Sequence, residues 1–146
     1  MRQVLYVSAA RPDLSDAEID AVLLAARARN AELGVTGLLL EIDGGFLQIL
    51  EGEPDVLHAL MRAIGRDARH SGVTTLLERE VSARQFPNWA MGFRRSSARE
   101  LPQTAFRITR AAIDDRLEPI GRDELAVLID SFCAVNDRDL RDAKAA

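Results

Sequence analysis

The segment GLLLEIDGGFLQILEG, residues 37–52, constrains the fold more than any other part of the chain. Two short hydrophobic runs flank the sequence Asp43-Gly44-Gly45, where glycine supplies the positive φ angles that a tight hairpin turn requires. We therefore predict two antiparallel strands. The second strand carries Gln48 on the same face as Phe46 and Leu50. A buried Gln48 amide costs about 1–3 kcal/mol without hydrogen-bond partners, so the fold or a ligand must supply them.

A strand and a helix are predicted before this hairpin. Residues 3–8, QVLYVS, alternate and are rich in β-branched and aromatic side chains, which is typical of a strand that presents Tyr6 on one face. The sequence SDAE, residues 15–18, is a capping box that predicts a helix ending before Gly34. Its hydrophobic stripe comprises Ile19, Val22, Leu23, Ala26 and Leu33. Asn30 falls within about 20° of the first residue of that stripe, so a second amide is expected to face the interior.

A helix and two strands are predicted after the hairpin. Pro54 opens the helix, and the polar residues 66–70 are expected to close it before Gly72. Residues 73–81 predict a further strand, and residues 86–94 are expected to hold a fifth strand after the Pro87-Asn88 turn. The element order is βαββαβ with one more strand. This order predicts an α/β (α+β) ferredoxin-like sandwich with an extra fifth strand.

The chain from residue 96 onward is predicted to be helical. A regular hydrophobic stripe comprises Leu125, Leu128, Ile129, Phe132 and Val135. We expect two helices separated by Pro119-Ile120-Gly121, followed by a frayed tail from about Asp137. These boundaries divide the chain into a domain at residues 1–95 and a helical extension at 96–146. The extension is expected to pack on the free face of the sheet or to form a dimer contact.

Composition limits the class of function. A chain of 146 residues fits one domain, and a net charge of −4 argues against nucleic-acid binding, which needs a basic face. The single cysteine, Cys133, excludes an internal disulfide, and two histidines with one cysteine form no cluster with metal-ligand spacing. No hydrophobic run approaches the roughly 20 residues that span a bilayer, and Arg11-Pro12-Asp13 interrupts the apolar N-terminal stretch too early for a signal peptide. We therefore expect a cytoplasmic protein without membrane association.

Three polar side chains, Tyr6, Asn30 and Gln48, are expected to point into one space between packed elements. Each has a simpler interpretation: a strand tyrosine with its hydroxyl at the rim, a helix asparagine bonded to the backbone, or a strand glutamine facing solvent. Their convergence favours a binding site.

The motifs around these residues are LYVS, ARARNAELGVTGLLL, GGFLQILEGE, IGRDARH and ARQFPNWAMGF. In this order and spacing the sequence closely resembles the BLUF family, blue-light sensors that bind a flavin noncovalently between two helices of a ferredoxin-like sheet. The resemblance runs from Tyr6 to about Phe93. The combination N-x-x-x-G-[IV]-T-G-x-L followed by G-x-F-x-Q-x-L-E-G is highly specific.

The resemblance implies a role for each candidate residue. Gln48 would lie between the flavin ring and the hydroxyl of Tyr6, and Asn30 would bind the carbonyl and N3 region of the ring. Trp89 and Met91 match positions near the flavin on the last strand, and which of them faces it stays open.

Further positions match the part of the family site near the far ring and the ribityl chain. They are Arg66, Asp67 and His70, with Arg29 beside the ribityl chain. FAD is the flavin we expect. FMN and riboflavin stay open, because the sequence has no G-x-G-x-x-G phosphate cradle.

The implied mechanism is photochemical rather than enzymatic. Under blue light, Tyr6 would pass an electron and then a proton towards the oxidised flavin, and Gln48 would rearrange. The segment Trp89-Ala90-Met91 would carry the signal towards the C-terminal helices. Residues 96–146 are too few for an output enzyme, so the signal is expected to act on an unidentified protein partner or on a homodimer or higher homo-oligomer, with residues 125–135 as a candidate surface.

Two alternatives stay open at this point. A flavin-dependent redox enzyme would need an acid or base near the ring, for which Asp67 and His70 are the candidates. A light-independent interaction module would use the same fold without a cofactor.

Overall fold

Five strands pair into one sheet in the order β4-β1-β3-β2-β5. Their bounds are β1 Arg2–Ala10, β2 Thr36–Ile42, β3 Gly45–Gly52, β4 His70–Glu80 and β5 Ala90–Arg95. Neighbouring strands are antiparallel except β2 and β5, which run parallel. The computed structural model describes residues 1–42, 44–87, 90–95 and 124–136, and of residues 90–95 and 133–136 it describes the backbone.

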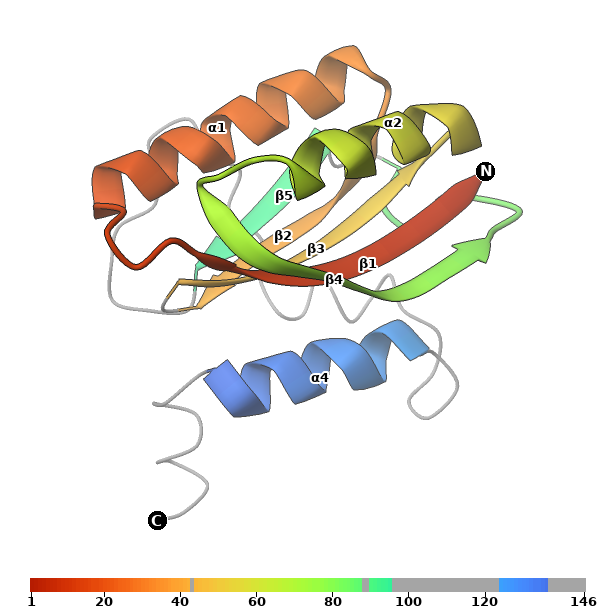
Figure 1. Ribbon diagram of the computed structural model, residues 1–146. Helices are drawn as coiled ribbons and strands as arrows, with labels where there is room; N and C mark the ends of the chain where they lie inside the picture. Colours follow the sequence, from red (N-terminus) through yellow and green to blue (C-terminus); the bar gives the residue numbers. More distant parts are fainter. Residues whose placement is uncertain (43, 88–89, 96–123, 137–146) are drawn as a thin grey trace.

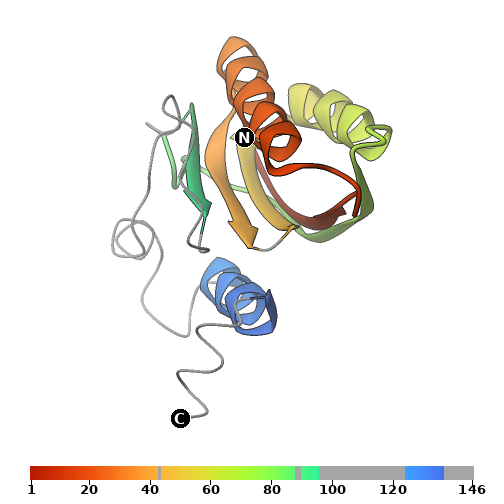
Figure 2. The same ribbon diagram turned by 90° about the vertical axis from the view of Figure 1, so that its left-hand side faces the viewer.

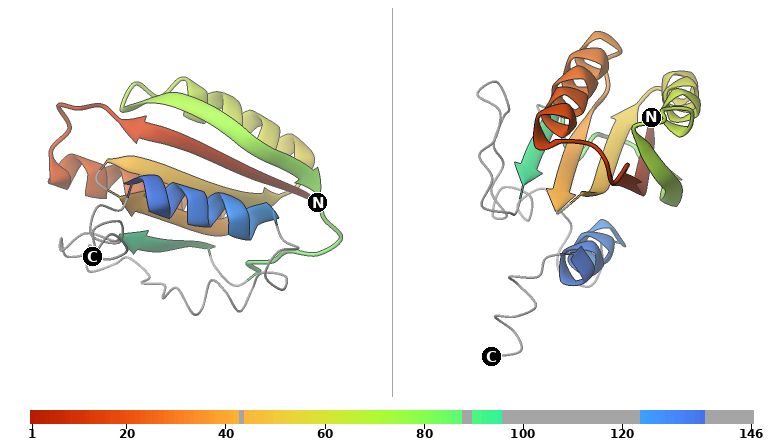
Figure 3. Two further views of the ribbon diagram at one scale, coloured as in Figure 1. Left: turned by 90° about the horizontal axis from the view of Figure 1, so that it is seen from below. Right: turned by 60° about the vertical axis from the view of Figure 1, so that its left-hand side comes forward.

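Helices cover both faces of the sheet (Figures 1 and 2). Helices α1 (Asp16–Glu32) and α2 (Pro54–Gly65) lie on one face, and α4 (Glu124–Asn136) lies on the other. Seen from below, α4 runs beneath the middle of the sheet (Figure 3). The predicted ferredoxin-like sandwich with a fifth strand is confirmed. The first predicted C-terminal helix, the break at 119–121 and the tail from Asp137 lie outside the described residues.

The hydrophobic core has two parts, one on each face of the sheet. The part under α1 and α2 contains Val4, Tyr6, Ile19, Leu23, Val35, Leu39, Phe46, Leu50, Leu57, Leu60 and Ile64. The part that α4 covers contains Leu5, Leu38, Leu40, Ile42, Leu47, Ile49, Phe86, Leu125, Ile129 and Phe132. Successive strand side chains point to opposite faces, so Gln48 faces α1 and α2 whereas Leu47 and Ile49 face α4.

The boundaries of α1 follow local signals in the sequence. The capping box is confirmed: Glu18 N donates to Ser15 Oγ at 3.2 Å, and Ser15 N donates to the Glu18 carboxylate at 3.2 Å. The helix ends before Gly34, whose φ of 68° suits glycine. Leu33, predicted to lie on the hydrophobic stripe, is 43% exposed because it is the C-cap residue beyond the last helical turn.

Gly37 lets β2 and β3 approach closely. A Cβ atom at this position would lie 1.8 Å from the carbonyl oxygen of Ile49. No side chain fits there without moving the backbone, which gives a steric reason for the glycine in the TGLLL motif. The hairpin that follows contains Gly44 with a φ of 85°, as its turn requires.

The connection between α2 and β4 differs from the prediction. The sequence predicts that residues 66–70 close the second helix, but α2 ends at Gly65 and His70 is already the first residue of β4. Between them, the backbone N of Arg69 donates to the Asp67 carboxylate at 3.0 Å. This local bond favours a turn over another helical turn.

Candidate functional site

A cavity of about 270 Å³ lies on the α1/α2 face of the sheet. Its lining comprises Tyr6, Leu14, Val22, Leu23, Ala25, Ala26, Arg29, Leu39, Phe46, Gln48, Ile64, Asp67, Arg69 and His70. Hydrophobic side chains form most of these walls, and a few polar groups stand among them. That composition is typical of sites for small organic ligands, and the volume is close to the lower end of their usual range.

Tyr6 and Gln48 form a buried hydrogen-bonded pair at the floor of this cavity. They are direct cross-strand partners in the antiparallel pairing of β1 with β3, so their side chains stand next to each other on one face. The Tyr6 hydroxyl donates to Gln48 Oε1, and the two residues are 4% and 2% exposed. Burial raises the pKa of the Tyr6 phenol, an effect that the positive charge of Arg29 opposes and Asp67 reinforces. The phenol is therefore protonated at neutral pH and acts as the donor.

Asn30 carries a fully buried amide that the described part of the chain leaves unsatisfied. Neither its Oδ1 nor its Nδ2 has a hydrogen-bond partner within the part of the chain that the structure describes. Ala26, one turn earlier on the same helix face, lines the cavity. The Nε atom of the adjacent Arg29 is buried without a described partner as well. Such groups are rare in native proteins, and a bound polar molecule is a common explanation.

His70 links β4 to α2 and β1 at the wall of the cavity. Its Nε2 lies 2.8 Å from the carbonyl oxygen of Ile64, which can only accept, so Nε2 carries a proton. In the neutral ring Nδ1 then accepts from the Ser8 hydroxyl at 2.9 Å. Both ring nitrogens are thus occupied by the protein itself.

Asp67 and Arg69 form an ion pair at the cavity wall. Arg69 Nη2 lies 2.6 Å from Asp67 Oδ2, and Arg69 Nε donates to Oδ1 at 3.0 Å. The side-chain bond from Arg69 holds the pKa of Asp67 at about 2, well below its usual 3.8. Asp67 is therefore a poor proton acceptor at neutral pH.

The predicted site residues are only partly brought together. Tyr6, Gln48, Arg29, Asp67 and His70 line the cavity, whereas Asn30 is buried on the same helix as Arg29 but is not among the lining residues. In contrast, Arg66 is exposed at the C-cap of α2 and is not among the lining residues. Trp89 and the side chain of Met91 lie outside the described residues.

Sequence reasoning did not name Arg69 as a site residue. The signal available was its position between Asp67 and His70 in the motif IGRDARH. Within the described ranges, no group of three or more histidine, cysteine, aspartate or glutamate side chains could hold a metal ion. Likewise, no described helix is long and apolar enough to cross a membrane.

The sequence matches the family model "BLUF: Sensors of blue-light using FAD" over residues 1–92. This match covers more than half of the chain, and the chain belongs to the BLUF family of blue-light flavin sensors. The resemblance identified from the motifs is confirmed.

Characterised relatives share this region as a small part of their length. Photoactivated adenylate cyclase subunit beta of Euglena longa is 36% identical over 87 residues, which cover 59% of this chain and 10% of that protein. The blue light- and temperature-regulated antirepressor BluF of Escherichia coli K12 is 35% identical over 83 residues, covering 57% of this chain and 21% of that protein. A segment shared by such different proteins is consistent with a sensor module.

Solved structures share the fold. BlrB, a BLUF protein in its dark state, superposes with a TM-score of 0.61 at 33% identity, covering 64% of this chain and 71% of that one. Klebsiella pneumoniae BlrP1, in a complex with manganese and cyclic diGMP, superposes with a TM-score of 0.69 at 28% identity, covering 91% of this chain and 32% of that one. Another structure of BlrP1 contains FMN.

Proposed function

We propose that this chain senses blue light by holding an oxidised flavin in the α1/α2 cavity and by switching the Tyr6–Gln48 hydrogen bond beside it. One observation carries the proposal. The Tyr6–Gln48 pair lines the hydrophobic cavity, and Asn30, whose buried amide has no partner among the described residues, lies one helical turn beyond Ala26 in the cavity wall. A flat heterocycle with polar edges would supply hydrogen bonds to the Asn30 amide, for which the described residues offer none.

The residues present fit such a ligand. Asn30 offers one donor group and one acceptor, which match an edge that carries both a carbonyl and an N–H. Arg29 Nε offers a further buried donor. Asp67 and His70 line the wall on the α2 side. Arg66 is exposed and does not line the cavity. It would therefore contact only a part of the ligand that extends out of the cavity.

A bound flavin supplies blue-light absorption and accepts an electron when excited. The contribution of the chain is a hydrogen-bond network with two arrangements. In the structure Tyr6 Oη donates to Gln48 Oε1. Rotation of the amide exchanges its oxygen and nitrogen, and Gln48 Nε2 then donates to the Tyr6 oxygen. The two amide orientations make different hydrogen bonds. In a buried site of low dielectric these bonds are strong, so the amide occupies one orientation or the other and acts as a two-state switch.

The environment of the acid and base candidates favours a sensor over a flavin-dependent redox enzyme. An enzyme would need a free base near the ring. Asp67 is paired with Arg69 and has a pKa of about 2, and both nitrogens of His70 are bonded to Ser8 and Ile64. We propose that the chain itself catalyses no reaction.

Light-regulated relatives act through other parts of longer proteins, and BLUF sensors signal to effector domains or partners. For this chain we propose an output through Trp89-Ala90-Met91 and the C-terminal helical extension, residues 96–146, to a cytoplasmic protein partner or to a homo-oligomer. The backbone of β5 supports this route, because it pairs with β2 at the sheet edge. Light scattering in darkness and under blue light would test the oligomer, and cell fractionation would test the location.

The primary test is an absorption spectrum in darkness, under blue light and during return to darkness. We expect a bound flavin spectrum that shifts slightly to the red and reverts. Gln48→Leu is expected to keep the flavin and lose the shift, since leucine fills the space without hydrogen bonds. Flavin that bleaches instead of shifting would favour a redox enzyme. Protein that takes up no flavin even on reconstitution would contradict the proposal.

A further inference from the structure

A buried carboxylate on the α4 face holds the segment that precedes β5. Glu51, near the end of β3, is fully buried. Its Oε2 accepts a hydrogen bond from the backbone N of Gln85 at 2.8 Å, and its Oε1 accepts one from the backbone N of Phe86 at 2.7 Å. Gln3 Nε2 donates to Oε2 at 3.0 Å. Bonds to a carboxylate are stronger than neutral ones, so this is a stiff connection between β3 and residues 85–86.

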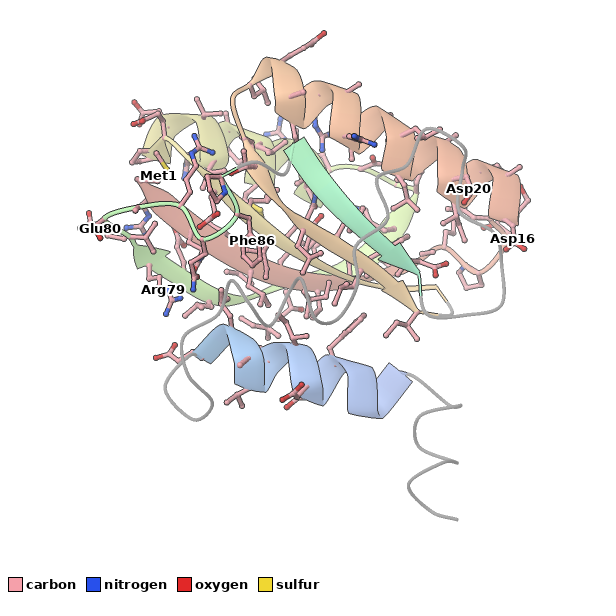
Figure 4. All side chains as sticks on the ribbon, turned by 180° about the vertical axis from the view of Figure 1, so that it is seen from behind. Met1, Asp16, Asp20, Arg79, Glu80 and Phe86 are labelled. Atoms are coloured by element: carbon pink, nitrogen blue, oxygen red, sulfur yellow. The ribbon has the colours of Figure 1, made fainter. Side chains whose placement is uncertain are left out.

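Gln3 extends the connection to the neighbouring strands. It lies opposite Glu51 in the pairing of β1 with β3. Its Nε2 also donates to Gln85 Oε1 at 2.7 Å, and its Oε1 accepts from Arg79 Nε at 2.8 Å. Arg79, on β4, lies towards the same end of the sheet as Phe86 (Figure 4). One network therefore joins β4, β1, β3 and the segment that leads into β5.

The Arg84 side chain links the same segment to the start of β2 by hydrogen bonds. Its Nη1 donates to Thr36 Oγ1 at 2.8 Å and to the carbonyl oxygen of Glu51 at 2.9 Å. Its Nη2 donates to the carbonyl oxygen of Gly34 at 2.9 Å. Residues 84–86 are thus hydrogen-bonded both to β3 and to the start of β2, a few residues before β5 begins.

Phe86 connects this segment to α4. Its side chain is fully buried in the part of the core that also contains Ile49 of β3 and Leu125 and Ile129 of α4. Ile49 is the chain neighbour of Gln48, which faces the cavity on the other side of the sheet. A displacement of β3 therefore acts at once on Glu51, on Phe86 and on the contact surface of α4.

We propose that Glu51 is the positioning residue through which a rearrangement at Gln48 reaches the other face of the sheet. Its carboxylate transfers a shift of β3 to the backbone amides of Gln85 and Phe86, and from there to β5 and α4. This inference rests on the proposed light-driven switch at Gln48. It assigns a signalling role to a residue that lies outside the cavity and does not line it.

The test is hydrogen exchange at the backbone amides of residues 85 and 86, in darkness and under blue light, with the absorption shift recorded on the same samples. In the parent chain we expect light to change these exchange rates by about threefold or more. Glu51→Gln keeps one acceptor oxygen but places its NH2 group against the other backbone N–H, so exchange should be fast at one of the two amides in both conditions and the light effect there should disappear, while the absorption shift stays. Glu53→Gln is the matched control, because this glutamate is exposed and makes no side-chain cap bond.

Three outcomes separate the possibilities. If the parent chain shows a normal absorption shift but the same hydrogen-exchange rates at residues 85 and 86 in darkness and under light, the inference about Glu51 is overturned and the proposed function is not. The same light effect in Glu51→Gln as in the parent chain would also overturn it. No absorption shift in the parent chain would overturn the proposed function, and the inference with it. If Glu51→Gln does not fold, Glu51→Asp keeps the charge, withdraws the carboxylate by one methylene and should give the same loss.

Discussion

The two faces of the sheet differ in how completely the described chain satisfies their buried polar groups. On the α1/α2 face, the Asn30 amide and Arg29 Nε have no hydrogen-bond partner among the described residues. On the α4 face, Gln3 and Glu51 are buried just as deeply, yet each has both of its side-chain polar atoms bonded within the chain. Both faces are otherwise packed with aliphatic side chains.

The difference indicates which face binds a ligand and which stabilises the fold. A buried group without a partner costs about 1–3 kcal/mol, which a bound molecule can recover. A group satisfied by the chain contributes to folding with or without a ligand. Substitutions of the unsatisfied groups on the α1/α2 face should therefore change stability differently with and without flavin, whereas substitutions on the α4 face should change it equally in both forms.

The largest expected effect is the complete loss of the light response in Tyr6→Phe. The phenyl ring keeps the packing of the cavity floor, but it cannot donate to Gln48 or pass on a proton. Flavin should stay bound, and the red shift under blue light should be absent from the absorption spectrum. Ser8→Ala is the matched control, because it removes a hydroxyl from the same strand that bonds to His70 instead. Loss of flavin from Tyr6→Phe would show that the tyrosine is structural.

Asn30→Ala should weaken flavin binding by about tenfold or more, because polar edges of the ligand then lose their partner. The same change should raise the unfolding free energy of the flavin-free protein by about 1 kcal/mol, because an unsatisfied buried amide is removed. Flavin titration and urea denaturation measure the two quantities. Equal destabilisation of both forms would contradict the assignment of Asn30 to the ligand.

Gln3→Ala should lower the unfolding free energy by about 2 kcal/mol, and by the same amount with and without flavin. The substitution removes a donor from Glu51 and Gln85 and an acceptor from Arg79, all within the chain. Urea denaturation of both forms measures it. If the unfolding free energy falls only in the flavin-bound form, the distinction between the two faces is contradicted.

The smallest expected effect concerns the ion pair at the cavity wall. The pKa of Asp67 is lowered from 3.8 to about 2, so the ion pair stabilises the fold above pH 3.8 and loses this contribution as the pH falls towards 2. Asp67→Asn should cost under about 1 kcal/mol at pH 7, because the Arg69 side chain is 46% exposed. Unfolding free energies of both proteins from pH 7 to pH 2 should converge at the acid end. A gap that persists at pH 2 would mean that packing, not charge, is lost.

Much of the architecture could be predicted because its signals are local. The capping box at residues 15–18, the glycines of the hairpin and the alternation along β1 and β3 depend on neighbours within a few residues. The same alternation placed Tyr6 and Gln48 on one face, and their pairing in the sheet followed. The end of α2 at Gly65 shows the limit of such signals. It depends on the bond from the backbone N of Arg69 to the Asp67 carboxylate and on the pairing of β4 with β1, neither of which hydrophobic periodicity reveals.

The sequence by itself determined the order of the elements, the faces of their residues and, through its motifs, the family. Only the tertiary structure decided which buried polar groups find a partner. Asn30 follows Arg29 on a helix and Glu51 follows Leu50 on a strand, and neither local sequence shows which of the two will find a hydrogen-bond partner. Glu51 meets two backbone amides from a segment more than thirty residues away, whereas the Asn30 amide meets none of the described groups. Satisfaction of a buried group depends on contacts between distant segments, and these exist only once the chain has folded.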